Sequence, residues 1–256
     1  NLGRSLMRVL VVDADRPRNA ATLNSHGFLT RDGVAPHELR RMARDELAAY
    51  PNIEVRTRVR VLELRRSAPP ADAGADAGTG PGTDSGTDAG FTASVGRKDP
   101  TDVVTARSVL LATGLRETLP DVPNLRGFYG ISLFSCAACD AWELRGRRLA
   151  LIGETPDLAD RARLISRWTE SLTVFTLGAD TVTAAEEAEL ASTGVAVLRH
   201  PIVELVGDRG RIEAIRLTDG TVVAVEGGFV RPEWQTDVSF PVSYTHLRAH
   251  ETRGNL

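Results

Sequence analysis

Apolar and polar residues follow two different periods along the first part of the chain, and together they predict an α/β fold. Residues 7–12 are apolar except for Arg8 and lead into Asp13, which is typical of a buried parallel strand. Residues 36–50 carry apolar side chains at three- and four-residue spacing, so they predict a helix, which Pro51 ends. Residues 53–64 alternate apolar and polar positions, as expected for a half-exposed strand.

A segment without large apolar residues interrupts this pattern. Residues 67–90 consist of Ala, Gly, Asp, Pro, Ser and Thr, which cannot bury enough surface to offset the entropy of ordering the chain. We therefore expect a disordered loop that joins two strands. The apolar pattern resumes at 91–95 and at 103–111, and the second of these predicted strands closes with the tripeptide Ala-Thr-Gly.

A second α/β unit begins near Arg147. An apolar strand at 149–152, a helix at 157–170 and a strand at 172–175 predict one strand–helix–strand crossover of the usual length. The boundary between the two units is expected near residues 120–124, where two prolines stand close together. The remaining predicted elements are a helix at 184–192 and strands at 195–198, 202–206, 212–217 and 221–225.

The composition is that of an ordinary globular protein. Of the 256 residues, 42% are hydrophobic and 25% are charged, which excludes wholesale disorder and suffices for two domains. The formal net charge of -3 offers no basic field, so we expect neither nucleic acid nor a membrane as a partner. The two cysteines are too few for a disulfide scaffold, and they favour a reducing, cytoplasmic location.

Both ends of the chain are expected to be incomplete. The chain begins with Asn1 and enters its first predicted strand abruptly, which favours a truncated start. At the other end, residues 242–252 read as eleven consecutive codons in one frame of a short-read sequencing adapter. We therefore expect 242–256 to be a non-native tail, and we give no metal-binding meaning to His246 and His250, although they stand four residues apart.

The strongest chemical signal is the pair of cysteines. Cys136 and Cys139 stand three positions apart, and Asp140 follows directly. At the start of a helix, sulfurs at this spacing reach bonding distance, the helix dipole favours a thiolate, and the aspartate can give or take a proton. We favour a redox-active disulfide. A zinc site, two inert buried thiols and a thioredoxin-like domain are the alternatives, although no second pair of zinc ligands is evident and a thioredoxin pair stands early in its domain.

The order of these signals resembles one flavoprotein family. The Cys-x-x-Cys-Asp segment at 136–140 resembles the site of thioredoxin reductase-like, FAD-dependent pyridine nucleotide–disulfide oxidoreductases, and the resemblance covers residues 7–234. It implies an α/β fold of two Rossmann-like, three-layer domains that bind dinucleotides. Residues 1–119 would form a partial FAD-binding domain, and residues 120–234 a pyridine-nucleotide-type domain that carries the cysteine pair. The resemblance places the first glycine loop for FAD before Asn1 and a flavin-binding segment after the last native residue.

The resemblance also implies roles for individual residues. Cys139 would face the flavin, and Cys136 would be the interchange thiol that meets the substrate. Asp13, at the end of its strand, would meet the adenosine ribose of FAD. His26 lies in a segment similar to the family's stretch that runs close to the flavin ring. That His26 is an ordinary loop histidine is an equal alternative. The strand that closes the first half of the family's FAD domain is similar to the one that ends in Ala112, Thr113 and Gly114.

The sequence departs from the family at the pyridine-nucleotide site. Gly153 keeps the first glycine of the expected Gly-x-Gly-x-x-Gly/Ala turn. Thr155 stands at the second glycine and Leu158 at the small residue, while Glu154 and Asp157 add negative charge where a pyrophosphate would bind. We therefore expect poor or absent NADPH binding, whereas FAD remains the expected cofactor.

These departures shift the expected function within the family. Residues 176–180 also lack the arginine cluster that would hold the 2'-phosphate of NADPH. Relatives with a degenerate nucleotide site resemble dithiol oxidases, which close a disulfide in a small dithiol and pass electrons from FAD to oxygen. Other relatives accept electrons from a different protein donor through the same cysteine pair. The predicted function is therefore an FAD-dependent thiol–disulfide oxidoreductase, a dithiol oxidase whose substrate is a small dithiol or a thioredoxin-like protein. The resemblance implies a homodimer. An NADPH-dependent thioredoxin-disulfide reductase and a non-catalytic nucleotide-binding module are the alternatives.

Overall fold

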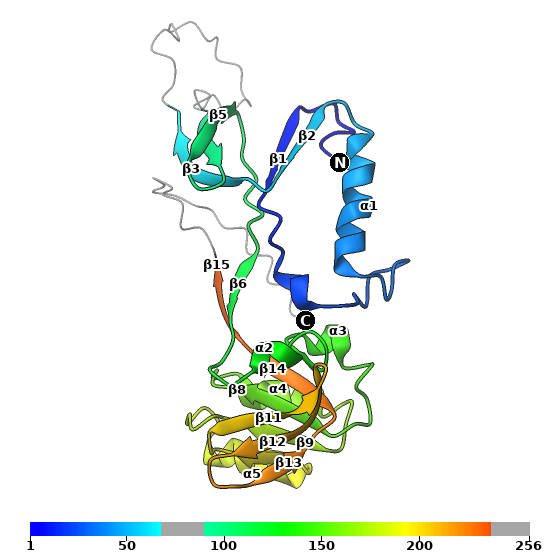
Figure 1. The fold of residues 1–256 in the computed structure, drawn as a ribbon, viewed down its shortest axis with the longest axis vertical. Coiled ribbons are helices and arrows are strands. Elements are labelled where there is room, and N and C mark those ends of the chain that lie inside the picture. The colour runs from blue at the N-terminus through cyan, green and yellow to red at the C-terminus, as the bar shows by residue number, and fades with distance from the viewer. Residues whose placement is uncertain (68–89, 237–256) are drawn as a thin grey trace, which may run out of the picture. The chain divides into compact units, whose positions relative to one another are not determined.

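The computed structural model describes residues 1–67 and 90–236 of the chain (Figure 1). Apart from its two end residues, the expected disordered loop at 67–90 lies outside the described residues, and so do the expected non-native tail and its histidines. The described residues divide into two compact units. Residues 17–46 group with the second unit rather than with the segments on either side of them. The described parts of unit 1 fall within Asn1–Arg16, Leu47–Gly114 and Thr236, and unit 2 comprises Pro17–Glu46 and Leu115–Gln235.

A five-stranded parallel sheet forms the centre of unit 2 (Figure 1), and its strands lie in the order β10, β9, β8, β14 and β7. The predicted strand–helix–strand crossover is confirmed as β8 (Leu149–Gly153), α4 (Leu158–Ile165) and β9 (Leu172–Phe175). α4 ends earlier than expected because the chain turns at Ser166. The remaining members of this layer are α5 (Ala184–Ser192), β10 (Ala196–Leu198), β14 (Gly227–Arg231) and β7 (Leu133–Phe134).

The two faces of this sheet are buried by different kinds of structure, which gives unit 2 three layers. Leu149 and Leu151 of β8 belong to a hydrophobic cluster with residues of α4 and α5. Ala150 and Ile152 belong to a second cluster, which is shared with an antiparallel sheet. Side chains of a strand alternate between its faces, so a strand buried on both faces must be apolar throughout, as this one is. The antiparallel sheet consists of β11 (Ile202–Asp208), β12 (Arg211–Leu217) and β13 (Val222–Ala224).

Unit 1 holds two smaller sheets. β1 (Val9–Asp13) pairs in parallel with β2 (Ile53–Thr57), so the first apolar run forms a parallel strand as predicted. Its residues are half-buried rather than buried. An antiparallel sheet with Leu64, Ala93 and Val95 in its core is made of β3 (Arg60–Arg66), β4 (Phe91–Gly96) and β5 (Pro100–Ala106).

Two predicted strands differ from the structure. The strand expected at 53–64 is divided into β2 and β3, because Arg58 takes a φ of 61°, which interrupts the extended backbone. The strand expected at 103–111 ends at Ala106, and residues 107–114 form no strand. No strand of the described chain pairs with 107–114, so this apolar stretch has no hydrogen-bonded ladder to join, and Leu110 is 83% exposed.

The other helices and one small sheet complete the described fold. The predicted helix at 36–50 is confirmed as α1 (Pro36–Ala48). None of the helices among the described residues is long and apolar enough to cross a membrane. The remaining elements are η1 (Arg18–Ala21), α2 (Leu125–Phe128), α3 (Ala137–Asp140) and a two-stranded sheet of β6 (Leu115–Thr118) and β15 (Glu233–Thr236).

Because β8 is buried on both faces, shortening one of its core side chains should destabilise the fold strongly. Leu151 is 1% exposed, so we expect Leu151→Ala to lower the free energy of unfolding by about 2–5 kcal/mol, through lost burial and the cavity it leaves. Leu29 is 88% exposed and gives a matched control, since Leu29→Ala should change the free energy by less than about 0.5 kcal/mol. Urea unfolding followed by circular dichroism measures both, and equal losses in the two variants would contradict the layer arrangement.

Candidate functional site

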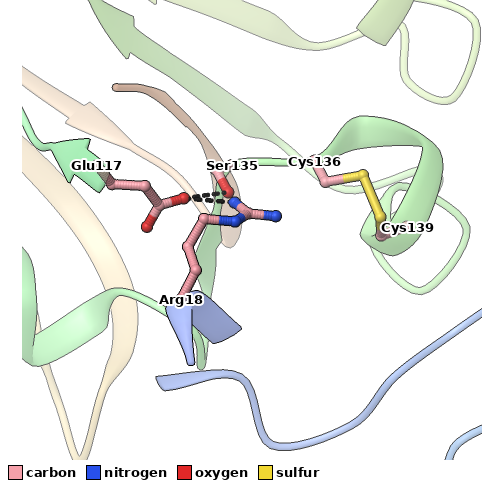
Figure 2. Close-up of a disulfide and its surroundings, with 5 residues drawn as sticks. All are labelled: Arg18, Glu117, Ser135, Cys136 and Cys139. Carbon is pink, nitrogen blue, oxygen red and sulfur yellow. Dashed lines mark hydrogen bonds and ion pairs between the residues drawn. A yellow bond between two sulfur atoms is a disulfide. The ribbon is translucent and has the colours of Figure 1, made fainter. Parts of the chain in front are cut away.

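The two cysteines form a disulfide at the start of α3 (Figure 2). The Cα atoms of Cys136 and Cys139 are 5.3 Å apart. Cys136 is the N-cap of α3, and its carbonyl oxygen accepts hydrogen bonds from the backbone N–H groups of Cys139 and Asp140, at 3.3 and 3.2 Å. This single turn brings the two sulfurs onto the same side of the backbone, which is the arrangement that the three-residue spacing predicts.

The helix behind the disulfide is shorter than the sequence interpretation assumes. α3 has four residues, and one turn of helix carries little of the dipole expected to stabilise a thiolate. Zinc needs cysteine as a free thiolate, and both cysteines are bonded to each other here. In residues 1–67 and 90–236, no group of three or more His, Cys, Asp or Glu side chains is arranged to hold a metal ion.

Asp140 is the buried titratable group beside the disulfide. The residue is 9% exposed. Burial disfavours its charged form and raises its pKa to about 6, while the electrostatic interaction with His26 opposes this shift and that with Glu143 adds to it. A carboxyl group with a pKa near 6 gains and loses a proton readily at neutral pH, which suits an acid–base group next to exchanging thiols.

His26 lies in the same charged surroundings as Asp140. Its Nδ1 atom is 3.5 Å from an oxygen of Asp32 and 3.6 Å from an oxygen of Glu143. The other oxygen of Asp32 accepts a hydrogen bond of 2.8 Å from the backbone N–H of Gly27, so the loop that carries the histidine is closed on itself. The structure therefore places His26 beside Glu143 and within electrostatic reach of Asp140, all within unit 2.

A network that the sequence does not reveal holds the residue before Cys136 (Figure 2). Glu117 is its centre, with a side chain that is 11% exposed. One of its carboxylate oxygens accepts hydrogen bonds from Arg18 at 2.5 Å and from the hydroxyl of Ser135 at 3.4 Å. The other oxygen accepts the hydroxyl of Tyr129 at 3.0 Å, and burial raises the pKa of that tyrosine to about 12. Ninety-nine residues separate Arg18 from Glu117, so no local pattern could predict the pair.

A second ionic network occupies the turn that follows β8. The carboxylate of Asp157 accepts hydrogen bonds from Arg231, Arg161 and the hydroxyl of Thr155. Burial by itself would raise the pKa of Asp157, but these hydrogen bonds outweigh it and lower the pKa to about 2. Gly153 opens the turn, and a Cβ atom placed there would lie 2.7 Å from the Cβ of Arg231. The glycine therefore leaves room for the arginine that holds Asp157.

Comparison with curated proteins gives consistent relatives. No family model matches the chain. A probable thioredoxin reductase of Arthroderma benhamiae is 28% identical over 180 residues, which cover 70% of this chain and 40% of that protein. Thioredoxin reductase of Treponema pallidum is 28% identical over 137 residues, which cover 49% of this chain and 44% of that protein. The chain thus spans less than half the length of these two relatives.

Solved structures decide the family. The structure of TrxB of Bacillus anthracis, which is described as a thioredoxin reductase, is 30% identical to this chain and superposes with a TM-score of 0.80. The match covers 93% of this chain and 72% of that one. The chain belongs to the thioredoxin reductase-like family. An oxidoreductase from Agrobacterium tumefaciens is also 30% identical, with a TM-score of 0.76 over 93% of this chain and 71% of that one. The predicted α/β fold of the two-domain Rossmann type is confirmed by these structures and by the parallel sheets described above.

The residues expected to contact cofactors in this thioredoxin reductase-like chain fall in both units. Asp13 ends β1 in unit 1, and its side chain accepts a hydrogen bond of 2.8 Å from the backbone N–H of Asp15. His26 and Gly153 lie in unit 2. The remaining expected contacts, which belong to unit 1 and to no strand, are Ala112, Thr113 and Gly114. Their roles toward FAD stay predictions.

The raised pKa of Asp140 predicts a pH-dependent stability. The folded protein binds this proton more tightly than the unfolded chain, whose aspartate titrates near 3.8. The free energy of unfolding of the wild type should therefore fall, relative to Asp140→Asn, as the pH rises from about 4 to about 7, by up to roughly 3 kcal/mol. Asp180, whose side chain is 99% exposed, gives the control variant Asp180→Asn. Urea unfolding across this pH range measures the difference, and parallel curves for the wild type and both variants would contradict the assignment.

Proposed function

We propose that this chain is part of an FAD-dependent thiol–disulfide oxidoreductase that works as a dithiol oxidase through Cys136 and Cys139. The observation that carries the proposal is the disulfide at the start of α3, with the buried carboxyl group of Asp140 directly after it. Membership of the thioredoxin reductase-like family supports the flavin. Since the chain covers only part of its curated relatives, substrate and partners belong to the proposal as well.

The chain's own residues can carry out the thiol chemistry in two steps. A thiolate of the substrate attacks the sulfur of Cys136, the Cys136–Cys139 bond breaks, and Cys139 leaves as a thiolate. The second thiolate of the substrate then attacks its own sulfur in this mixed disulfide, which releases the oxidised substrate and leaves two reduced cysteines. Two electrons have then moved from the substrate to the protein. Asp140, with a pKa of about 6, can protonate the departing thiolate of Cys139 and later accept the proton back.

The chemistry of unit 1 fits part of an FAD site. Asp13 stands at the carboxyl end of the parallel strand β1, the position from which an acidic residue binds an adenosine ribose. When bound, FAD supplies the two-electron acceptor that returns the cysteine pair to the disulfide. We assign the ribose contact to Asp13. The further residues expected to contact FAD are Ala112, Thr113, Gly114 and His26.

The residues of unit 2 do not fit NADPH. Thr155 and Leu158 replace the small residues of the turn, and the Asp157 carboxylate engages two arginines where a pyrophosphate would need them. These features favour an oxidase, in which electrons enter from a dithiol. Because the curated relatives are named thioredoxin reductases, an NADPH-dependent reductase is the second candidate function. For the same reason, a thioredoxin-like protein is a candidate substrate in addition to a small dithiol.

Replacing either cysteine tests the thiol chemistry. We expect Cys136→Ser and Cys139→Ser each to lower oxygen-dependent oxidation of dithiothreitol by the FAD-loaded protein at least about a thousandfold, because the disulfide cannot form with one sulfur. Ser192→Ala, on the exposed side of α5, serves as the control and should keep full activity. Oxygen uptake measures the rates. Turnover that survives in both cysteine variants would leave a non-catalytic module as the better interpretation.

Mixing the oxidised, FAD-loaded protein with NADPH separates the two enzyme candidates. We expect the visible flavin absorbance to persist with NADPH and to bleach rapidly with a dithiol, because in the proposed function electrons reach the flavin only through the cysteine pair. Stopped-flow absorbance without oxygen records both reactions. Rapid bleaching by NADPH would defeat the oxidase and establish the reductase.

A further inference from the structure

The carboxyl ends of two neighbouring strands in unit 2 meet at a cluster of charged side chains. β8 and β14 are paired so that Gly153 lies opposite Arg231. The amino end of α4 follows the same turn, and Asp157 is its N-cap. Ligands of open parallel sheets bind at this edge, and phosphate groups bind at the helix amino end. Arg231 and Arg161 would therefore be well placed for an anionic ligand, but an anion of the chain already lies between them.

Both oxygens of the Asp157 carboxylate bind side chains of this charged cluster. Its Oδ1 atom accepts hydrogen bonds from the hydroxyl of Thr155 at 2.7 Å and from Nε of Arg231 at 3.0 Å. Its Oδ2 atom is 2.6 Å from Nη2 of Arg231 and 3.2 Å from Nε of Arg161. A guanidinium that binds two oxygens at once holds phosphate and carboxylate in the same way. Although Asp157 is the N-cap, its side chain caps no backbone N–H of α4, so its acceptors serve the arginines and not the helix.

We propose that Asp157 is a built-in substitute for the dinucleotide pyrophosphate: it binds Arg231 and Arg161 and thereby closes this site to NADPH and NADH. The proposal deepens the proposed function by naming the group that excludes the nucleotide, but it concerns binding alone. A pyrophosphate that entered would meet a fixed negative charge and would have to separate Asp157 from Arg231, whose side chain is 19% exposed.

Two further observations support this role. The pKa of Asp157 is lowered to about 2, so the carboxylate stays charged at neutral pH and protonation cannot relieve the repulsion. Gly153, the first glycine of the nucleotide turn, leaves room for the backbone and Cβ of Arg231, where a Cβ at position 153 would lie 2.7 Å away. The glycine therefore serves the internal ion pair in this chain.

Removing the carboxylate should open the site. We expect Asp157→Ser and Asp157→Asn to bind NADPH at least about tenfold more tightly than the wild type, because the repulsive charge is lost and Arg231 becomes available. Isothermal titration calorimetry on the 256-residue chain with NADPH, and then with NADH, measures the affinities. Asp160→Ser is the matched control, since Asp160 lies on the same helix, pairs with Arg163 at 2.6 Å and should give no gain. Adding Arg231→Gln to Asp157→Ser should abolish the gain.

The outcomes separate this proposal from the thiol chemistry. Folded Asp157 variants that bind NADPH no more tightly than the wild type would overturn it. An equal gain in Asp160→Ser would show a general effect of net charge and would overturn it too. Thermal unfolding checks that each variant is folded, and Asp157→Asn, which keeps the size of the side chain, guards against loss of structure in Asp157→Ser. No result depends on turnover, so failure here would leave the cysteine mechanism as it stands.

Discussion

The parallel pairing of β8 with its neighbours is the constraint on which both candidate sites of unit 2 depend. β8 is buried on both faces, between α4 and α5 on one side and the antiparallel sheet on the other, so its register with β14 is fixed. β14 pairs in turn with β7, and Cys136 follows β7 by two residues. The disulfide and the Asp157 network therefore both follow carboxyl ends of strands in one sheet, and burial of the sheet holds each of them in place.

Two aspartates of this unit show how surroundings decide what a carboxyl group can do. Asp140 is buried, and the loss of water is the largest influence on it, so its pKa rises to about 6. Asp157 is also partly buried, but hydrogen bonds from two arginines and a hydroxyl outweigh the loss of water, and its pKa falls to about 2. At neutral pH the first can carry a proton, whereas the second is a permanent charge. The same type of side chain can thus exchange a proton near neutral pH in one place and is a fixed counter-ion in the other.

The sequence carries those features that depend on short-range pattern. The apolar run of β8, the helix after it and the three-residue cysteine spacing each require only local geometry, and all three are found, although the helix ends earlier than predicted. The unusual glycine turn could be predicted as well, because its residues are consecutive. What the sequence could not predict are contacts between distant segments, such as Arg18 with Glu117 and Arg231 with Asp157, which are 99 and 74 residues apart.

The strand expected at 103–111 failed for a related reason. Apolar residues such as Leu110 have the composition of a strand, but a strand exists only where a second one supplies its hydrogen bonds. Within the described chain no such partner lies beside 107–114, so the apolar pattern alone did not suffice.

The thiol site and the nucleotide turn together bear on the direction of electron flow. A thioredoxin reductase-like protein needs one site that delivers electrons to the flavin and another that removes them. In this chain a buried carboxyl group directly follows the cysteine pair, whereas a charged carboxylate binds two arginines in the turn after β8. Charge of the wrong sign opposes binding more effectively than the absence of a favourable contact, because a ligand must both meet the repulsion and break an existing ion pair. Electron entry through the disulfide is therefore the direction that the proposed function assigns to this chain.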